Sequence, residues 1–321
     1  MKKILVTGGG GYVGTVLIDS LLNDGNQVTV VDTFWFGNFL KKNKNLEIVK
    51  EDIRNLSIEK IKSHNTIIHL ANIANDPTVA MDPELSWNVN VLGTHSLIDK
   101  ASRAGVEHFI FGSSGSVYGI KDEPDVVEDM ILVPISTYNK TKMVAERVIM
   151  SYSENLKVHC IRPATVCGYS PRMRLDISVN LLTMQALEKG EITVFGGNQT
   201  RPNINIKDMI NVYLHFISKN SIESGCYNAG LENMTILEIA EIIKKKTGAK
   251  INIEASNDPR SYRQNSDKLI STGFKFKYNV DHAIEEIISK YNNNSLEDKK
   301  IYYNLKVMKD LDLDKIKKST Q

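Results

Sequence analysis

Four consecutive glycines near the N-terminus leave this chain few folds to choose from. They lie in the run Thr7-Gly8-Gly9-Gly10-Gly11-Tyr12-Val13-Gly14, directly after a short apolar stretch of strand type, residues 3–7. Apolar residues then recur at helical spacing at Val13, Val16, Leu17, Leu21 and Leu22. Gly25 is a natural helix stop, and a second strand-type run, residues 27–31, ends at Asp32. A strand, a glycine turn, a helix, a strand and an acid in this order are typical of a dinucleotide-binding unit.

The same residues indicate which dinucleotide is bound. The glycines allow a tight turn and let backbone N–H groups at the start of the helix approach a pyrophosphate. Asp32, at the end of the second strand, can accept hydrogen bonds from a ribose hydroxyl, and its charge would repel a 2′-phosphate. The sequence therefore predicts a site that prefers NAD to NADP.

Strand and helix patterns continue to alternate beyond Asp32. Strand-type runs occupy residues 46–50, 66–70 and 107–111, and a long helical pattern, residues 84–104, ends at a glycine. This alternation predicts an α/β fold of the Rossmann type, a doubly wound parallel sheet, with ligands bound at the carboxyl ends of the strands. The residues expected at those ends are Asp32, Asp52, Ala71 and Ser114.

Tyr138 and Lys142 are four residues apart in the sequence. On a helix this spacing places both side chains on one face, one turn apart. A phenol is a poor base at neutral pH because its pKa is about 10, and a nearby ammonium lowers that pKa. The two residues are therefore a candidate pair for proton transfer.

The composition argues against several classes of partner. With 40 Lys and Arg against 38 Asp and Glu, the net charge of +2 gives no argument for binding nucleic acid or an anionic membrane. The sequence has no run of about 20 apolar residues that could span a bilayer. The three cysteines, Cys160, Cys167 and Cys226, form no metal-ligand or disulfide pattern. This predicts that the protein has no metal site and that it is located in the cytoplasm.

A series of motifs fills the first half of the chain. In chain order they are Thr7-Gly8-x-x-Gly11-x-x-Gly14, Asp32, Asp52-Ile53, His69-Leu70-Ala71, Asn90-x-x-Gly93-Thr94, Ser113-Ser114-x-x-Val117-Tyr118-Gly119 and Tyr138-x-x-x-Lys142. In order and spacing the chain resembles the extended short-chain dehydrogenase/reductase family, specifically its branch of nucleotide-sugar epimerases and dehydratases. A looser similarity continues to about residue 290.

The resemblance implies a role for each of three residues. Tyr138 would be the general base, which takes the proton from a sugar hydroxyl while hydride leaves the same carbon for the nicotinamide. Lys142 would hold the nicotinamide ribose and lower the pKa of Tyr138. Ser114 would hydrogen-bond to the reacting oxygen.

The resemblance also implies which residues bind the ligands. NAD is expected to contact Gly8, Gly11, Tyr12, Val13, Gly14, Asp32, Asp52, Ile53, Leu70, Ala71, Asn90, Tyr138 and Lys142. A nucleotide-diphosphate sugar is expected to contact Ser114, Ser116, Thr165, Arg174, Arg201 and Arg260. Arg201 and Arg260 would clamp the diphosphate, because a guanidinium binds phosphate in bidentate fashion.

Two departures from the family pattern bear on the reaction and on the substrate. In the 4,6-dehydratases an Asp-Glu pair follows the serine or threonine, whereas Gly115 and Ser116 stand at those positions here and cannot act as acid or base. Dehydration is therefore not expected. Thr165 stands where the family usually has an asparagine that contacts the substrate.

The chain is expected to divide into three parts. These are an NAD-binding Rossmann domain, residues 1–165, a smaller α/β substrate-binding region interleaved with it, residues 166–295, and a charged C-terminal tail, residues 296–321. Residues 170–176 are expected to open a helix, and the Lys-rich tail to be solvated. By analogy with the family, we expect a homodimer packed through the helix at 84–104 and the Tyr138 helix.

Three functions remain open at this point. The first is a nucleotide-sugar 4-epimerase of surface polysaccharide biosynthesis, which oxidises the carbon-4 hydroxyl, lets the ketone turn over and returns the hydride to the other face. The second is a net carbon-4 dehydrogenase with a 4-keto product, since residues 171–176 resemble a run in GDP-heptose dehydrogenases. The third is a non-enzymatic NAD-binding regulator.

Overall fold

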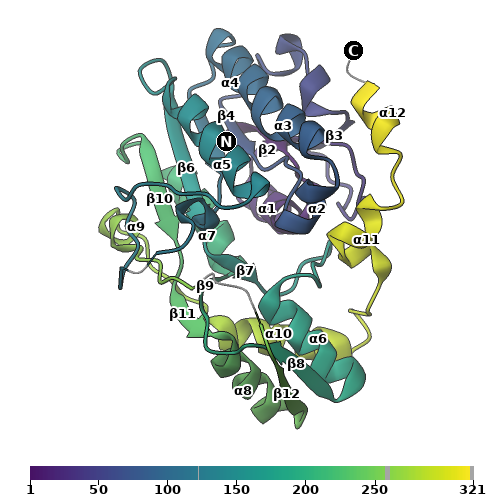
Figure 1. Ribbon diagram of the computed structural model, residues 1–321. Coiled ribbons are helices and arrows are strands. Elements are labelled where there is room, and N and C mark those ends of the chain that lie inside the picture. The colour runs from purple at the N-terminus through teal and green to yellow at the C-terminus, as the bar shows by residue number, and fades with distance from the viewer. Residues whose placement is uncertain (122, 257–260, 319–321) are drawn as a thin grey trace.

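The computed structural model describes residues 1–121, 123–256 and 261–318. Its central element is a parallel sheet of seven strands in the order β10-β6-β5-β4-β1-β2-β3. The strands are β1 (Lys3–Thr7), β2 (Gln27–Asp32), β3 (Leu46–Lys50), β4 (Thr66–His69), β5 (His108–Gly112), β6 (Lys157–Pro163) and β10 (Gly225–Ala229). The inner strands are buried on both faces and therefore read as continuous apolar runs. The sheet confirms the predicted Rossmann-type fold (Figure 1).

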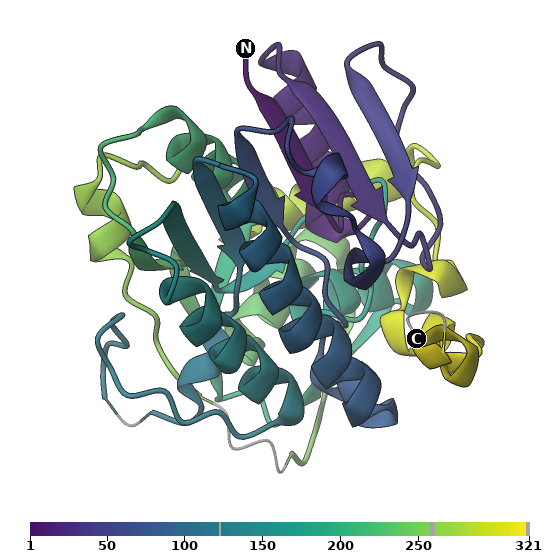
Figure 2. The same cartoon turned by 90° about the horizontal axis from the view of Figure 1, so that it is seen from above.

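Helices cover both faces of this sheet (Figure 1). On one face α1 (Tyr12–Asn23) packs beside α7 (Ile206–Ser218). On the other face lie α3 (Pro83–Trp87), α4 (Thr94–Arg103) and α5 (Thr137–Met150). Figure 2 shows α4 and α5 side by side. The predicted helix at 84–104 is therefore present, and it contains a π-helical segment, η3 (Asn88–Gly93).

A smaller α/β region lies below the sheet in Figure 1. Its strands form a sheet in the order β11-β9-β7 and a parallel pair, β12-β8. They are β7 (Thr165–Cys167), β8 (Glu191–Phe195), β9 (Thr200–Asn205), β11 (Glu232–Thr235) and β12 (Lys250–Glu254). Helices α6 (Ser178–Lys189), α8 (Ile236–Thr247) and α10 (Val280–Asn292) share a core of their own with β7, β8, β11 and β12. The two parts are interleaved, because α7 and β10 come from the second half of the chain but belong to the central sheet and the helices that cover it.

The remaining elements are short. They are α2 (Asp76–Met81), α9 (Asp267–Ser271), α11 (Asn304–Met308), α12 (Leu313–Lys318), η1 (Ile53–Asn55), η2 (Ile58–Lys60), η4 (Gly115–Tyr118) and η5 (Lys300–Tyr302). Within the described ranges, no helix combines the length and the apolar character that crossing a bilayer requires. The cytoplasmic location stays a prediction.

The prediction that a helix begins within residues 170–176 is wrong. The next helix, α6, begins only at Ser178, and the residues before it have neither helical nor strand structure. Two contacts hold this stretch in its irregular form. The Ser170 hydroxyl donates to the carbonyl of Tyr12 at 2.7 Å, and the Leu175 N–H donates to the carbonyl of Tyr302 at 2.9 Å. A backbone N–H that is committed to a distant partner cannot close a helical turn.

Three buried histidines make the fold sensitive to acid. Burial is the main cause that lowers the pKa of His69 and of His108 to about 3, and that of His159 to about 4. Between about pH 6.5 and about pH 4 the unfolded chain binds protons at these rings while the folded protein does not. We therefore expect the free energy of unfolding to fall as the pH decreases through this range, by up to about 1.4 kcal/mol per pH unit for each such proton. Urea unfolding at several pH values measures this dependence.

A double variant tests which histidines are responsible. His108 and His159 hydrogen-bond to each other, Nε2 to Nδ1, at 2.7 Å. In His108→Asn/His159→Asn the free energy of unfolding should depend less steeply on pH than in the wild type. His282→Asn, at an exposed position of α10, should keep the wild-type dependence. An equally steep dependence in the double variant would contradict the assignment.

Candidate active site

Three adjoining chambers lie at the carboxyl ends of the central strands. The aromatic chamber includes Gly8, Gly10, Gly11, Asp32, Phe34, Trp35, Phe36, Asp52, Ile53, Leu70, Ala71 and Val89 in its wall. The wall of the tyrosine chamber includes Gly8, Gly11, Tyr12, Val13, Gly14, Leu70, Ser114, Tyr138, Lys142, Thr165, Arg172, Arg174 and Asn304. The wall of the tail chamber includes Asn75, Asp76, Ser116, Tyr138, Thr165, Ile177, Tyr303, Leu305 and Lys306. The chambers adjoin because they share wall residues.

The glycine turn approaches neighbouring backbone so closely that a side chain has no room at two positions. A Cβ atom on Gly14 would lie 2.5 Å from the carbonyl oxygen of Gly8, and one on Gly8 would lie 2.5 Å from the nitrogen of Ala71. Gly8 also has a φ of 72°, a region that glycine occupies without steric cost. The tight turn leaves the N-terminus of α1 in the wall of the tyrosine chamber, where its free N–H groups can bind an anion.

Asp32 stands beside the glycine turn at the end of β2. Its Oδ2 accepts a hydrogen bond from the N–H of Gly10 at 2.9 Å, and its Oδ1 accepts one from the N–H of Phe34 at 2.7 Å. Burial raises the pKa of Asp32, and these hydrogen bonds act in the opposite direction. The structure thus places the carboxylate in the wall of the aromatic chamber, next to the turn.

Two other predicted cofactor residues have their polar groups engaged within the protein. Asp52 lines the aromatic chamber with Ile53, and its carboxylate accepts Nε and Nη2 of Arg54 at 3.0 and 2.8 Å. Asn90 is buried, and it exchanges hydrogen bonds with the backbone of Ile73 at 2.8 and 3.1 Å. As far as the described residues define them, the chamber walls do not include Asn90. It supports the wall from behind, and its contact with NAD stays a prediction.

Tyr138, Lys142 and Ser114 come together in the wall of the tyrosine chamber. Tyr138 and Lys142 lie on α5, one turn apart, as their spacing predicts. Ser136 is the N-cap of this helix, and its hydroxyl accepts a hydrogen bond from the N–H of Asn139 at 3.1 Å. Ser114 follows β5, and its side chain is close enough to Tyr138 to lower the pKa of the phenol.

The pKa of Tyr138 behaves differently from the expectation. Burial raises it to about 12, whereas the positive charge of Arg174 and the side chain of Ser114 lower it. Lys142 was expected to lower it, but its Nζ instead donates to the carbonyl of Gly112 at 2.7 Å. Among the described residues, Arg174 is a cation that favours the phenolate of Tyr138. The effect of Lys142 on that pKa stays a prediction.

Lys142 is itself strongly affected by its surroundings. The side chain is 3% exposed, and its ammonium lies 4.6 Å from the centre of the Phe111 ring. Burial lowers the pKa of Lys142 to about 7, while the negative charge of Glu146 and the nearby thiol of Cys160 raise it. A lysine with a pKa this close to neutrality can change its charge with small changes in its surroundings.

Four predicted substrate residues lie around Tyr138. Ser114, Thr165 and Arg174 line the tyrosine chamber, and Ser116 lines the tail chamber. Ser116 is linked to Ser114 through their hydroxyl oxygens at 2.7 Å. The guanidinium of Arg174 pairs with Asp176 at 2.9 Å, which holds it beside the chamber.

Of the two arginines expected to clamp a diphosphate, only Arg201 is among the described residues, and it is not in these walls. Arg201 lies on β9, and its Nη1 donates to the carbonyl of Thr200 at 3.2 Å. Among the described residues, the walls of the three chambers do not include Arg201. Arg260 lies outside the described residues. Both diphosphate contacts stay predictions.

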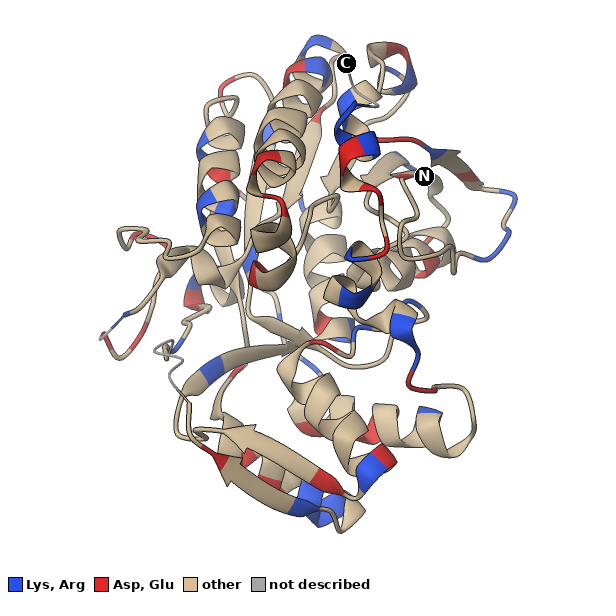
Figure 3. Cartoon of the chain, turned by 45° about the vertical axis from the view of Figure 1, so that its right-hand side comes forward, with Lys and Arg blue, Asp and Glu red and all other residues tan. Residues whose placement is uncertain are grey.

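The C-terminal segment packs closely on both parts of the protein, unlike the solvated appendage expected from its charge. Tyr302 is buried against the start of α1, and Met308 is buried among residues of the central sheet and its helices. Farther along, Lys317 pairs with Asp82 at 2.7 Å. Figure 3 shows acidic and basic residues intermixed along this segment. The buried residues Tyr302 and Met308 stand between these charged positions in the sequence. The wall of the tail chamber includes three residues of this segment, Tyr303, Leu305 and Lys306.

Met308 offers a direct test of this packing. Its side chain is 2% exposed, and truncating a buried methionine leaves a cavity. We expect Met308→Ala to lower the free energy of unfolding by about 2 kcal/mol or more, measured by urea denaturation. The adjacent Lys309→Ala, at an exposed position, should change it little. Equal stabilities for the two variants would mean that the segment does not pack as described.

Two features of these walls were missed by sequence reasoning. Phe34, Trp35 and Phe36 line the aromatic chamber, and an aromatic run directly after the end of a strand is the signal that could have found them. The guanidinium of Arg172 stacks 4.3 Å from the centre of the Phe36 ring and donates to Asn304 at 2.6 Å. No local pattern could reveal the last contact, because 132 residues separate its partners.

The fold and these walls define a class: a Rossmann-type enzyme with a glycine turn for a dinucleotide and a tyrosine–lysine pair beside it. More particularly, residues 4–230 match the model of the NAD dependent epimerase/dehydratase family, and the chain belongs to this family. Members of the family are NAD-dependent enzymes that act on nucleotide sugars.

Individual relatives carry out different reactions. UDP-glucuronic acid decarboxylase 1 of Danio rerio is 32% identical over 282 residues, which are 82% of this chain and 66% of that protein, just under two thirds. UDP-glucose 4-epimerase of Lactobacillus helveticus is 28% identical over 88% of this chain and 94% of its own length. The structure of UDP-glucuronic acid 4-epimerase from Bacillus cereus, in complex with UDP-glucuronic acid and NAD, has a TM-score of 0.81. It is 26% identical and covers 91% of this chain and 99% of its own.

Proposed function

We propose that the protein is a nucleotide-sugar 4-epimerase of surface polysaccharide biosynthesis, which oxidises carbon 4 of the sugar and reduces it again from the other face. One observation carries the proposal: Tyr138, Ser114 and Lys142 meet in the wall of a chamber that also contains the glycine turn. A dinucleotide on the turn and a sugar at Tyr138 would share that chamber, which is the proximity that hydride transfer requires. The 4-epimerases among the relatives support the same reaction.

The residues present fit NAD. The turn that excludes a Cβ at Gly8 and Gly14 leaves N–H groups at the start of α1 for the pyrophosphate, and the carboxylate of Asp32 would accept the hydroxyls of the adenosine ribose. Lys142 would hold the nicotinamide ribose. When bound, NAD supplies the acceptor and later the donor of the hydride.

The chain's own residues handle the proton and the substrate. The phenolate of Tyr138 takes the proton of the carbon-4 hydroxyl and returns it when the ketone is reduced. Ser114 hydrogen-bonds to the same oxygen, and Arg174 favours the charged form of the tyrosine. Thr165 and Ser116 would contact the sugar. Water elimination is not part of the proposal, because Gly115 and Ser116 offer no acid–base pair.

A net carbon-4 dehydrogenase is the second candidate. Residues 171–176 resemble a run of GDP-heptose dehydrogenases, and two side chains of this run, Arg172 and Arg174, line the tyrosine chamber. A decarboxylase shares the same first step, because oxidation at carbon 4 of a uronic acid gives a β-keto acid that can lose carbon dioxide. The three outcomes therefore differ only after the ketone has formed.

A panel of substrates separates these reactions. The purified protein is incubated with NAD and, in turn, UDP-glucose, UDP-glucuronic acid and GDP-heptose, while absorbance follows NADH and NMR identifies the products. A 4-epimer without lasting NADH is the expected result. Accumulation of NADH with a 4-keto sugar would replace the proposal with the dehydrogenase, and a pentose product with carbon dioxide would replace it with a decarboxylase. NAD binding without any product would favour the regulator.

We expect a homodimer to pack through the helical segment 84–104 and α5, and α4 of that segment lies beside α5 in Figure 2. The side chain of Leu92, on the π-helical segment between α3 and α4, is 60% exposed. In such a homodimer, α5 and its neighbours in the second copy would bury this apolar side chain. Light scattering of the purified protein measures the mass and tests this assembly.

A further inference from the structure

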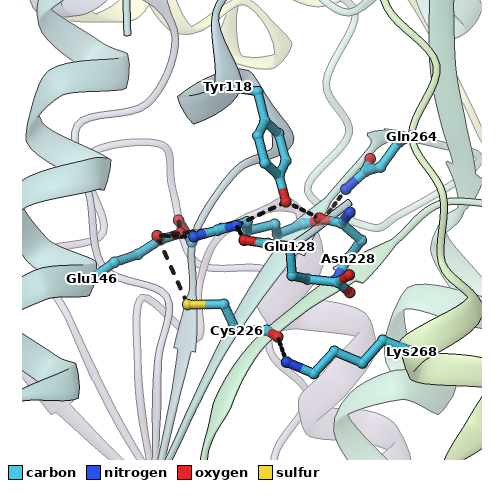
Figure 4. Close-up of polar contacts among 9 residues, drawn as sticks. Tyr118, Glu128, Glu146, Cys226, Asn228, Gln264 and Lys268 are labelled. Atoms are coloured by element: carbon cyan, nitrogen blue, oxygen red, sulfur yellow. Dashed lines mark hydrogen bonds and ion pairs between the residues drawn. The ribbon is translucent and has the colours of Figure 1, made fainter. Parts of the chain in front are cut away.

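A fully buried ion pair lies behind the tyrosine chamber, outside its wall. Arg162 on β6 donates Nε to Oε1 of Glu146 on α5 at 3.0 Å, and Nη2 to Oε2 at 2.8 Å. Both side chains are at most 5% exposed. Removing two charges from water costs much of what their attraction returns, so a pair buried this deeply is weak evidence for stability alone. Its surroundings point to another use (Figure 4).

The pair holds both ends of the loop that carries Ser114. At the start of the loop, the hydroxyl of Ser113 donates to Oε1 of Glu146. At the end of the loop, Nη1 of Arg162 donates to the hydroxyl of Tyr118 at 2.7 Å. Figure 4 shows Tyr118 reaching down to this network. Ser114 therefore lies between two residues that are each tied to one member of the ion pair.

Further contacts fix the network from the opposite side. The hydroxyl of Tyr118 donates to Oδ1 of Asn228 at 2.8 Å, and Gln264 donates to the carbonyl of Arg162 at 2.7 Å. These partners come from β10 and from the segment that follows β12, so residues from the second half of the chain help to position the loop (Figure 4). A guanidinium with this many fixed acceptors has little freedom to move.

The same carboxylate acts on Lys142. Glu146 follows Lys142 by four residues on α5, so the two lie one turn apart on one face. Within the described part of the chain, Lys142 interacts with Glu146 on its own helix, Cys160 on β6 and His69 on β4, and Tyr138 lies one turn away on the same face of α5. Burial holds His69 neutral, with a pKa of about 3. The interaction with the Cys226 thiol, together with burial, raises the pKa of Cys160. Glu146 is thus the negative charge that opposes the desolvation of Lys142.

From these contacts we propose that Glu146, held by Arg162, is a positioning residue for the proposed reaction: it sets the loop so that Ser114 faces Tyr138, and it provides the counter-charge for the ammonium of Lys142. The proposal rests on the proposed function for its consequence in catalysis. Its electrostatic part concerns the free protein and can be measured without any substrate.

The first experiment is an NMR titration of lysine side chains labelled at the ε-carbon. The signal of Lys142 is assigned as the one missing from Lys142→Gln. Glu146→Gln removes the negative charge and keeps one oxygen as an acceptor for Ser113. In this variant Lys142 should titrate at a pH lower by about one unit or more. Glu154→Gln, at an exposed position beyond the end of α5, should leave the titration unchanged. Titration of Lys142 at the same pH in Glu146→Gln and the wild type would overturn the proposal.

A second variant keeps the test possible if Glu146→Gln does not fold. Glu146→Gln leaves the guanidinium of Arg162 buried without its partner, whereas Glu146→Gln/Arg162→Gln buries no unpaired charge. Lys142 should titrate at a lower pH in the double variant as well, by a smaller amount, because a cation has been removed together with the anion. An unchanged titration in a folded double variant would also overturn the proposal.

The catalytic part is read from the dependence of kcat/KM on pH with whichever nucleotide sugar is turned over. In Glu146→Gln the loss of activity at high pH should begin about one pH unit lower, following the charge of Lys142. Arg162→Lys, which keeps the carboxylate paired but lacks the fork to Tyr118, should lower kcat without moving that limb. If the wild type turns over no sugar while the NMR shift is present, the proposed function fails and the assignment of Glu146 stands. If sugar is turned over and neither variant changes kcat or its pH profile, the positioning role is refuted.

Discussion

Replacing Tyr138 by phenylalanine is expected to lower kcat by about 10³-fold or more while NAD still binds. The phenol oxygen is the atom that takes the proton of the carbon-4 hydroxyl in the proposed reaction. The ring itself remains, so the shape of the chamber is kept. Steady-state kinetics with the substrate found in the panel measures the first effect, and isothermal titration calorimetry with NAD measures the second.

Tyr152→Phe is the matched control, because it removes a hydroxyl just beyond the other end of the same helix. Its kcat should stay within about twofold of the wild type. A Tyr138→Phe variant that kept near-normal turnover would show that another group moves the proton, and the assignment of the chamber as the active site would fall with it.

Gly14→Ala should weaken the binding of NAD by about 100-fold, which corresponds to about 2.7 kcal/mol. The added Cβ would lie 2.5 Å from the carbonyl oxygen of Gly8 and 2.7 Å from the backbone of Gly9. These are main-chain atoms, so the turn itself must move and its N–H groups lose their alignment. Calorimetric titration with NAD measures the change in affinity.

The control for this substitution is Gly225→Ala on β10. There the new Cβ would meet only side-chain atoms, at 3.6 Å or more, which is ordinary contact. Its affinity for NAD should equal that of the wild type. Wild-type affinity in a folded Gly14→Ala variant would mean that the dinucleotide does not bind at this turn.

Local patterns were sufficient to predict most of the central sheet. The apolar run before Gly8, the helical spacing after it and the acid that ends β2 are determined by residues close together in sequence, and the structure has each of them. The same holds for Tyr138 and Lys142, because helical spacing alone puts them on one face of α5.

Features that depend on contacts between distant parts of the chain could not be predicted in this way. The charge of the C-terminal segment suggested solvation, but Tyr302 and Met308 are buried by residues far away in sequence. The direction of the Lys142 side chain is another case. Spacing placed it next to Tyr138, but spacing could not show that its ammonium donates to the carbonyl of Gly112, or that Arg174, from a distant segment, also lowers the pKa of Tyr138.

The central claim is that the hydride leaves carbon 4 of a nucleotide sugar and returns to the same carbon. It is tested most directly with a substrate from the panel that carries deuterium at carbon 4, incubated with the protein and NAD in ordinary water. We predict a 4-epimer that retains the deuterium at carbon 4, because the label stays on the bound cofactor between the two transfers. A 4-epimer with hydrogen from solvent at that carbon would contradict the account, since it would require removal of a proton, not a hydride.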